Sequence, residues 1–138
     1  MCKKNTIVII SVLIVMLIII FYYWDVDTKK RKPVKFILAC FYTKWCGYST
    51  QLMNTGKWDK VKNFYIKSNY YGEIINITEI DCDEKSEIAA QNQIDAYPTI
   101  KLFINNNNKM SEIVYTGKNE PNDIITFTNR YLNKFMVY

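Results

Sequence analysis

The stretch that decides the fold is Phe41-Tyr42-Thr43-Lys44-Trp45-Cys46-Gly47-Tyr48-Ser49. It continues an apolar run from Val34 to Phe41, which is typical of a strand covered on both faces. Cys46 stands where a C-x-x-C dithiol site has its first cysteine, and Ser49 stands where that site has its second. A disulfide within this motif therefore cannot form.

The position of Cys46, at a turn from strand into helix, predicts a nucleophilic thiolate. Free backbone N–H groups and the helix dipole stabilise a thiolate over a thiol at this place. Lys44 is a candidate source of further positive charge. The alternative is a surface cysteine without a role, but its neighbours favour a site. We expect Trp45 to shield one side of the thiol and Gly47 to leave room for a substrate sulfur.

Ser49 limits what Cys46 can do. A hydroxyl can hydrogen-bond a thiolate, but it cannot attack a mixed disulfide and release the substrate. An adduct on Cys46 would need an external thiol for its resolution. That thiol could come from glutathione as a co-substrate, from another protein, or from the substrate itself, and the last route is disulfide isomerisation.

The remaining cysteines leave two interpretations open. Cys40, six residues before Cys46, is either a small apolar core residue or an alternative resolving thiol, provided that the two sulfurs reach disulfide geometry. Cys2 and Cys82 look structural or incidental. The absence of histidine and of any C-x-x-C pair argues against a zinc site and a Cys-His hydrolase.

Two later blocks complete a pattern. They are Ile80-Asp81-Cys82-Asp83-Glu84 through Ala96-Tyr97-Pro98-Thr99-Ile100-Lys101-Leu102-Phe103, and Val114-Tyr115-Thr116-Gly117-Lys118 ahead of a helical pattern. In this order and spacing, the three blocks resemble the thioredoxin superfamily, and the second favours protein disulfide isomerase domains within it. The resemblance runs from about Val34 to the C-terminus. It implies an α/β thioredoxin-like fold, with a βαβ–ββα core and a mixed four-stranded sheet.

The resemblance also implies a substrate-binding role for Tyr97 and Pro98. In the family, this proline follows a cis peptide bond opposite the reactive cysteine, and the backbone of the residue before it binds an extended substrate segment. The alternative is an ordinary proline at the start of a strand. At the position of Cys40, related domains carry a buried acid that assists the second cysteine. This chain has neither that acid nor the second cysteine, so the two replacements are consistent with each other.

Hydrophobic periodicity predicts seven segments within this domain. They are strands at 34–42, 73–80, 98–104 and 110–116, and helices at 47–68 with a break near Gly56, at 84–92 and at 120–135. Only residues 25–33 separate the first strand from an apolar segment, so we expect the first strand and helix of a full thioredoxin to be missing. The strand at 73–80 would then be a sheet edge that the linker or a partner covers.

A membrane-spanning helix is predicted at residues 7–24. Every residue there is apolar or aromatic except Ser11, and 18 residues at 1.5 Å each cover about 27 Å. The alternative is a cleaved signal peptide, which the length and the bulky Phe21-Tyr22-Tyr23-Trp24 disfavour. The predicted organisation is a basic N-terminus at 1–6, the span, a juxtamembrane linker at 25–33 and a domain at 34–138.

The orientation in the membrane stays open. Basic residues at 29–32 outnumber Lys3 and Lys4 and favour a cytoplasmic domain, whereas signal anchors with a short basic N-terminus often face the other way. We interpret the basic linker as touching anionic lipid, and it contributes much of the net charge of +5. The sequence has no phosphate-binding glycine loop and no basic stripe for nucleic acid.

The sequence thus predicts a single-pass, membrane-anchored monothiol protein whose partners are protein thiols or disulfides. It predicts no metal and no bound cofactor. The alternative is a redox-inactive thioredoxin-fold binding module that holds a protein partner at a membrane. The short domain and the Asn-, Ile- and Lys-rich composition also resemble membrane-anchored thioredoxin-like proteins of large DNA viruses, which would place the chain in a viral or host-cell endomembrane.

Overall fold

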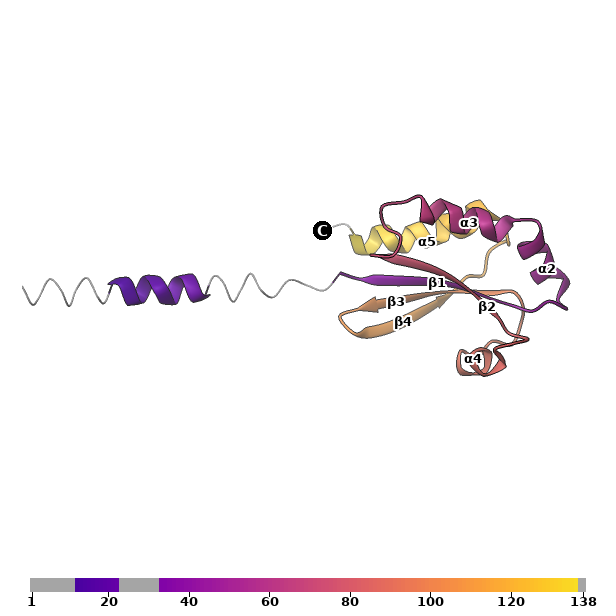
Figure 1. The fold of residues 1–138 in the computed structure, drawn as a ribbon, viewed down its shortest axis with the longest axis horizontal. Coiled ribbons are helices and arrows are strands. Elements are labelled where there is room, and N and C mark those ends of the chain that lie inside the picture. The colour runs from indigo at the N-terminus through magenta and orange to yellow at the C-terminus, as the bar shows by residue number, and fades with distance from the viewer. Residues whose placement is uncertain (1–11, 23–32, 137–138) are drawn as a thin grey trace, which may run out of the picture. The chain divides into compact units, whose positions relative to one another are not determined.

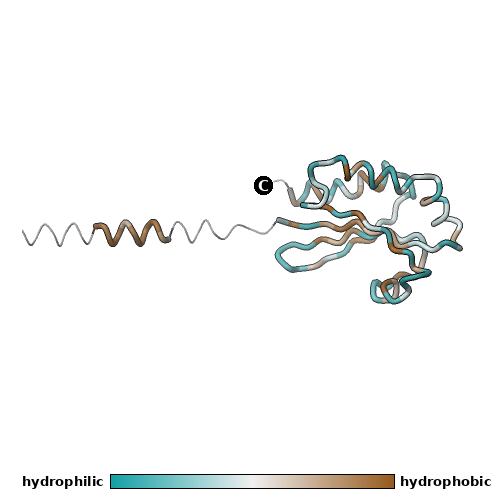
Figure 2. Tube along the Cα trace, in the orientation of Figure 1, coloured by the Kyte–Doolittle hydropathy of each residue, from teal (hydrophilic) through white to brown (hydrophobic). Residues whose placement is uncertain are grey.

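The computed structural model describes residues 12–22 and 33–136, and the chain divides into two units, Met1–Lys32 and Pro33–Tyr138. In the first unit, residues 12–22 form a helix that is hydrophobic over most of its described length (Figure 2). Among the described residues, no helix is both long and apolar enough to cross a membrane. The rest of the predicted span at 7–24, the N-terminus at 1–6 and most of the linker at 25–33 lie outside the described residues.

The second unit is built on a mixed four-stranded sheet, as the sequence predicts (Figure 1). Its strands are β1 (Lys35–Tyr42), β2 (Ile75–Asp81), β3 (Thr99–Asn106) and β4 (Lys109–Val114). They lie in the order β2-β1-β3-β4, with β1 parallel to β2 and antiparallel to β3, and β3 antiparallel to β4. Within the described sheet, β2 is an edge strand, which confirms the expectation for residues 73–80.

Helices cover the two faces of this sheet unequally. They are α2 (Gly47–Asn54), α3 (Lys57–Ile66), α4 (Ser86–Gln91) and α5 (Pro121–Met136). Figure 1 shows α3 and α5 on one face and α4 on the other. The predicted break near Gly56 is confirmed, because Gly56 has φ 69° and separates α2 from α3. A left-handed residue at this corner is tolerated most easily as glycine.

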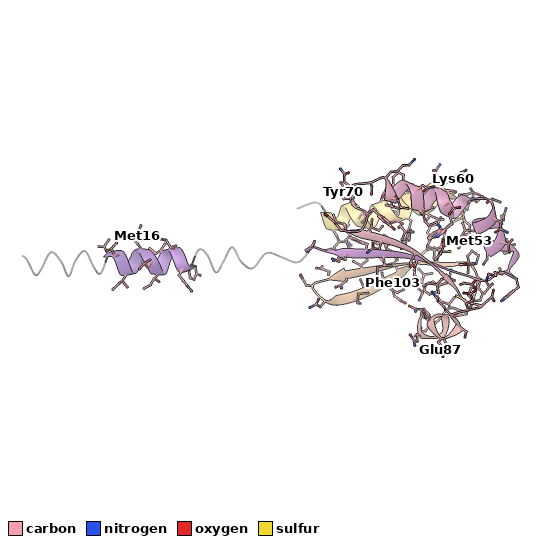
Figure 3. The ribbon with its side chains drawn as sticks, in the orientation of Figure 1. Met16, Met53, Lys60, Tyr70, Glu87 and Phe103 are labelled. Atoms are coloured by element: carbon pink, nitrogen blue, oxygen red, sulfur yellow. The ribbon has the colours of Figure 1, made fainter. Side chains whose placement is uncertain are left out.

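The alternating residues of β1 belong to two different cores. Phe36, Leu38 and Cys40 are fully buried on the side of α3 and α5. Ala39 and Phe41 point to the opposite side and pack with Cys82, Ala89 and other residues beneath α4. Figure 3 shows Phe103 on that second side of the sheet. This burial on both faces explains why the strand is a nearly continuous apolar run.

A buried ammonium fastens the end of α4 to the sheet. Lys101 on β3 is only 4% exposed. Its Nζ donates to the carbonyl of Asn92, 2.7 Å away at the C-terminal end of α4, and pairs with Oε1 of Glu112 at 3.0 Å. A buried charge needs such partners. The contact fixes the start of the segment that leads from α4 to Tyr97.

The division of β1 into two faces predicts different costs for neighbouring substitutions. Leu38→Ala should lower the free energy of unfolding by about 2–5 kcal/mol, because it opens a cavity in the core beneath α3 and α5. Ile37→Ala is the matched control, since Ile37 lies on the other face with 39% exposure, and should cost at most about 1 kcal/mol. Urea denaturation measures both, and equal costs would contradict this assignment of the faces.

Candidate active site

Cys46 lies at the N-terminal end of α2, as predicted. It is the N-cap residue of that helix, and its carbonyl accepts hydrogen bonds from the backbone N–H of Thr50 and from the Thr50 hydroxyl, each at 2.9 Å. The loop of residues 43–45 connects it to β1. Its side chain is partly exposed, and the sulfur lies 3.1 Å from the carbonyl oxygen of Tyr97, to which the thiol donates.

The surroundings of the sulfur favour ionisation. The backbone N–H of Ser49 lowers the pKa of Cys46 most, and the Ser49 hydroxyl and the Tyr48 N–H lower it further, against the opposing effect of desolvation. These N–H groups belong to the first turn of α2 and are free to point at an anion. The pKa of Cys46 therefore lies below its ordinary value, in the direction that the sequence predicts.

We expected Lys44 to add positive charge beside the Cys46 sulfur, but it does not contribute to the lowered pKa of Cys46. Its Nζ lies 2.7 Å from a carboxylate oxygen of Asp81 and 3.1 Å from one of Glu84. Its backbone N–H also donates to Asp83, at 2.7 Å. The charge of Lys44 is thus paired with carboxylates at the end of β2 and in the loop after it, and its contribution is to hold the loop of residues 43–45 in place.

Tyr97 and Pro98 face the cysteine, and the peptide bond between them is cis, as the resemblance implies. The ring of Tyr97 meets the ring of Trp45 edge-on, with the centroids 5.9 Å apart and the planes at 85°. Trp45 itself is 74% exposed, so it flanks the site more than it covers it. A Cβ added at Gly47 would meet no atom within 4 Å apart from its chain neighbours, so the space around Gly47 is open.

Ser49 occupies the inner side of the site. It is fully buried, and its Oγ accepts a long hydrogen bond of 3.4 Å from the backbone N–H of Thr43. The Ser49 hydroxyl also lowers the pKa of Cys46. The Thr43 hydroxyl is buried and has no partner among the described residues.

Cys40 lies in the core beneath α3 and α5 with no exposed surface, and it is a free cysteine. Burial raises the pKa of its thiol strongly, and the nearby Glu79 and Cys82 raise it further. A protonated thiol is a poor nucleophile. These features agree with a core residue, and the role of a resolving thiol stays a prediction.

Sequence reasoning missed one contact of the site. Cys82 is free, 5% exposed, and packs against Tyr97 beneath α4. No local motif signals this, because the two residues are brought together only by the pairing of β1 with β2 and β3. Among the described residues, no group of three or more His, Cys, Asp or Glu side chains could hold a metal ion.

Comparisons with known proteins agree with this architecture. The thioredoxin family model matches residues 23–130. Protein disulfide-isomerase of Oryctolagus cuniculus is 31% identical over 96 residues, which cover 70% of this chain and 18% of that protein. A thioredoxin domain-containing protein of Acanthamoeba polyphaga mimivirus is 29% identical over 97 residues, which cover 68% of this chain and 26% of that protein.

Solved structures give the same result. The zinc-bound form of human ERp44 is 25% identical, with a TM-score of 0.60 over 70% of this chain and 26% of that one. Because the family model covers well over half of the chain, the chain belongs to the thioredoxin family. It spans only about a fifth of the length of the disulfide-isomerase relative.

The geometry around Cys46 predicts how its reactivity depends on pH. Ser49→Ala removes a hydrogen bond that favours the thiolate, so the pKa of Cys46 should rise and its alkylation by iodoacetamide at neutral pH should slow about two- to fivefold. Trypsin releases Cys46 alone on the fragment of residues 45–57, which makes the rate specific to this cysteine.

The matched control is Ser68→Ala, whose hydroxyl donates to the Tyr65 carbonyl at the end of α3 and accepts from the backbone N–H of Tyr70. It should leave the alkylation profile of Cys46 unchanged. In the wild type, alkylation should slow as the pH falls and the thiolate takes up a proton, and in Ser49→Ala the midpoint should move to higher pH. An unchanged midpoint would show that the Ser49 hydroxyl does not act on the sulfur.

Proposed function

We propose that this protein is a monothiol thiol–disulfide exchange protein that acts through Cys46. The observation that carries the proposal is the pairing of an activated, partly exposed sulfur with the carbonyl of Tyr97 before a cis proline, while a buried serine fills the place of a second thiol. Membership of the thioredoxin family supports the same chemistry. The substrates would be disulfides or thiols of other proteins.

The exchange needs no cofactor, and its electrons balance within the reactants. The Cys46 thiolate attacks one sulfur of a substrate disulfide, a new S–S bond forms to Cys46, and the other substrate sulfur leaves as a thiolate that takes up a proton. Ser49 cannot carry out the return attack. A second thiol of the substrate then attacks the adduct in isomerisation, or glutathione attacks it in reduction, and the Cys46 thiolate is regenerated.

The site suits a substrate in extended conformation. When Cys46 is bonded to a substrate sulfur, its thiol no longer donates to the Tyr97 carbonyl. That carbonyl can then accept a hydrogen bond from a substrate backbone amide. Trp45 and Tyr48 are 74% and 73% exposed and flank the thiol with apolar surface. Aromatic side chains of this kind contribute strongly to protein contacts.

The alternative function is a binding module without redox chemistry. The same exposed aromatic residues and the free edge of β2 would then hold a protein partner without a covalent step. The lowered pKa of Cys46 favours the exchange function, because a binding module has no need of an activated sulfur.

We also propose that residues 7–24 anchor the domain to a membrane as a single-pass span. The support is the apolar sequence from Ile7 to Trp24, of which residues 12–22 are helical. One relative is a protein of a virus, Acanthamoeba polyphaga mimivirus, and we propose a viral or host-cell endomembrane as the location.

Adduct formation tests the exchange function. When the full-length chain is treated with oxidised glutathione, we expect one glutathione on the fragment of residues 45–57, and we expect reduced glutathione to remove it. Cys46→Ser should abolish this adduct while leaving thermal unfolding unchanged. Mass spectrometry of the tryptic fragments measures the result.

Two other outcomes would change the assignment. A folded protein without any modification of Cys46 would refute the exchange function and leave the binding module. A loss of two hydrogens that requires both Cys40 and Cys46 would show that Cys40 is a resolving thiol, and the monothiol mechanism would then be wrong. Trypsin places Cys40 on the fragment of residues 36–44, so a linked pair of fragments would identify this disulfide.

Extraction tests the membrane anchor. Full-length protein expressed in cells should stay in the membrane pellet after alkaline carbonate treatment. Replacing Ile14 and Leu17 with lysine should release it, since each charge at the centre of a span costs about 2.5–3.5 kcal/mol. The control is the double variant Ile14→Leu with Leu17→Ile, which keeps both side chains apolar. This variant should stay in the pellet. Release of the wild-type protein would contradict the anchor.

A further inference from the structure

The domain has an end at which the chain enters, at Pro33, and an opposite end that carries Cys46. β1 joins them, because it begins with Lys35 and ends with Tyr42 after eight residues. At about 3.3 Å per residue, these eight residues span about 26 Å. We call the first of these ends the entry end, and it consists of residues 33–36, 66–75, 104–110 and 131–136.

Backbone pairing and side-chain packing gather these four segments. Lys35 pairs with Asn105, so the turn between β3 and β4 lies beside the first residue of β1. The N–H of Phe36 donates to the Ile74 carbonyl at 2.7 Å, which brings the α3–β2 loop to the other side of β1. The rings of Phe36 and Phe135 meet edge-on at 5.9 Å, which adds the last turn of α5. Figure 1 shows all three at the end where β1 begins.

The entry end carries an excess of positive charge. Each of its segments holds one exposed lysine, and these are Lys35, Lys67, Lys109 and Lys134. Glu73 is the one acidic residue in the same segments. Among the described residues, none of the four lysines forms a salt bridge. The Cys46 end differs, because residues 81–87 alone hold four acidic residues and one lysine.

Aromatic and apolar side chains stand exposed among these lysines. Tyr70 and Tyr71 are 45% and 39% exposed, and Ile66 and Met110 are 51% and 55% exposed. Figure 3 shows Tyr70 at this end. The Tyr70 carbonyl accepts the N–H of Ile74 at 2.9 Å, so the loop that carries the two tyrosines is fixed to β2. Tyrosine rings and long lysine side chains, each apolar with a polar tip, suit the boundary between water and lipid.

We propose that the entry end is a lipid-facing surface that lies against the headgroups of an anionic membrane leaflet, with its lysines at the headgroup charges and Tyr70, Tyr71 and Met110 at the interface. This inference rests on the proposed membrane anchor. It goes beyond that anchor, because it assigns a membrane contact to the folded domain itself. The Cys46 end, with its acidic loop, is then directed away from the lipid.

The length of the chain before the domain favours lipid over another partner. Eight residues, 25–32, separate the proposed span from Pro33. Even when fully extended, they reach only about 30 Å, so the anchor keeps the entry end near the headgroups. Anionic lipid attracts basic residues held this close to its surface. Cys46 would therefore meet disulfides of proteins that project from the membrane.

Footprinting of amines on the full-length chain tests this surface. The protein is placed in vesicles of phosphatidylcholine, or of phosphatidylcholine with phosphatidylserine, and a membrane-impermeant reagent acetylates its lysines. In the anionic vesicles, Lys67, Lys109 and Lys134 should react about three- to sevenfold more slowly, the factor by which such a surface concentrates protons beside an amine. Raising the salt from about 0.1 M to about 1 M should remove the difference, because the screening length falls from about 10 Å to about 3 Å. Mass spectrometry measures each rate.

Two double variants separate docking from simple tethering. Lys67→Glu with Lys109→Glu should restore the fast acetylation of Lys134 in anionic vesicles. Lys85→Glu with Lys118→Glu makes the same change of charge at the Cys46 end, where both lysines are exposed, and should leave Lys134 slow. In the wild type, Lys85 and Lys118 should react equally fast in both kinds of vesicle.

Equal rates at Lys134 in the two kinds of vesicle would overturn the inference. Equal slowing at both ends of the domain would do so too, as would slow acetylation of Lys134 that persists in Lys67→Glu with Lys109→Glu. Failure of the anchor gives a different result, because the wild type would then leave the carbonate pellet, and vesicles added to the free chain would still test the surface. The glutathione adduct of Cys46 is measured without lipid, so the exchange function is tested separately.

Discussion

The pairing of β1 with a strand on each side is the constraint on which the rest of this structure depends. Its register with β3 sets Phe41 opposite Thr99, so the residues after β1 and the residues before β3 meet at one end of the sheet. Its register with β2 sets Tyr42 opposite Asp81, which brings a third loop to the same end. Cys46, Tyr97 and Cys82 are far apart in sequence, and they become neighbours because backbone hydrogen bonds fix these two registers.

At this end of the sheet, short-range electrostatic interactions set the pKa of Cys46. The first turn of α2 presents its free N–H groups to the Cys46 sulfur, and the carboxylates of Asp81 and Glu84 bind Lys44, so that Lys44 does not act on the sulfur. The activation of the thiol therefore comes first from the backbone N–H of Ser49, with further contributions from the Ser49 hydroxyl and the Tyr48 N–H. It persists as long as the helix begins at this residue, and it does not depend on a charged neighbour that salt would screen.

Most of the fold was predictable from the sequence, because it rests on local patterns. The strand before Cys46, the break at Gly56 and the cis bond before Pro98 follow from hydropathy, from a single glycine and from a family motif, and the structure confirms each. The role of Lys44 could not be predicted, because it depends on carboxylates almost forty positions away. The same holds for the contact of Cys82 with Tyr97, which exists only through the sheet register. The span at 7–24 extends beyond the described residues, so that prediction still rests on hydropathy.

The replacement of the second thiol by Ser49 changes which step the protein itself can control. A dithiol site both forms and resolves its adduct, whereas in the proposed monothiol mechanism the attack depends on Cys46 and the release depends on a thiol from outside. Cys40 is fully buried, and burial raises the pKa of its thiol strongly. The lifetime of a partner on Cys46 is then governed by how firmly the site holds it against external thiols. The Tyr97 carbonyl, 3.1 Å from the Cys46 sulfur, is well placed to hold a substrate backbone amide during that time under the proposed exchange function.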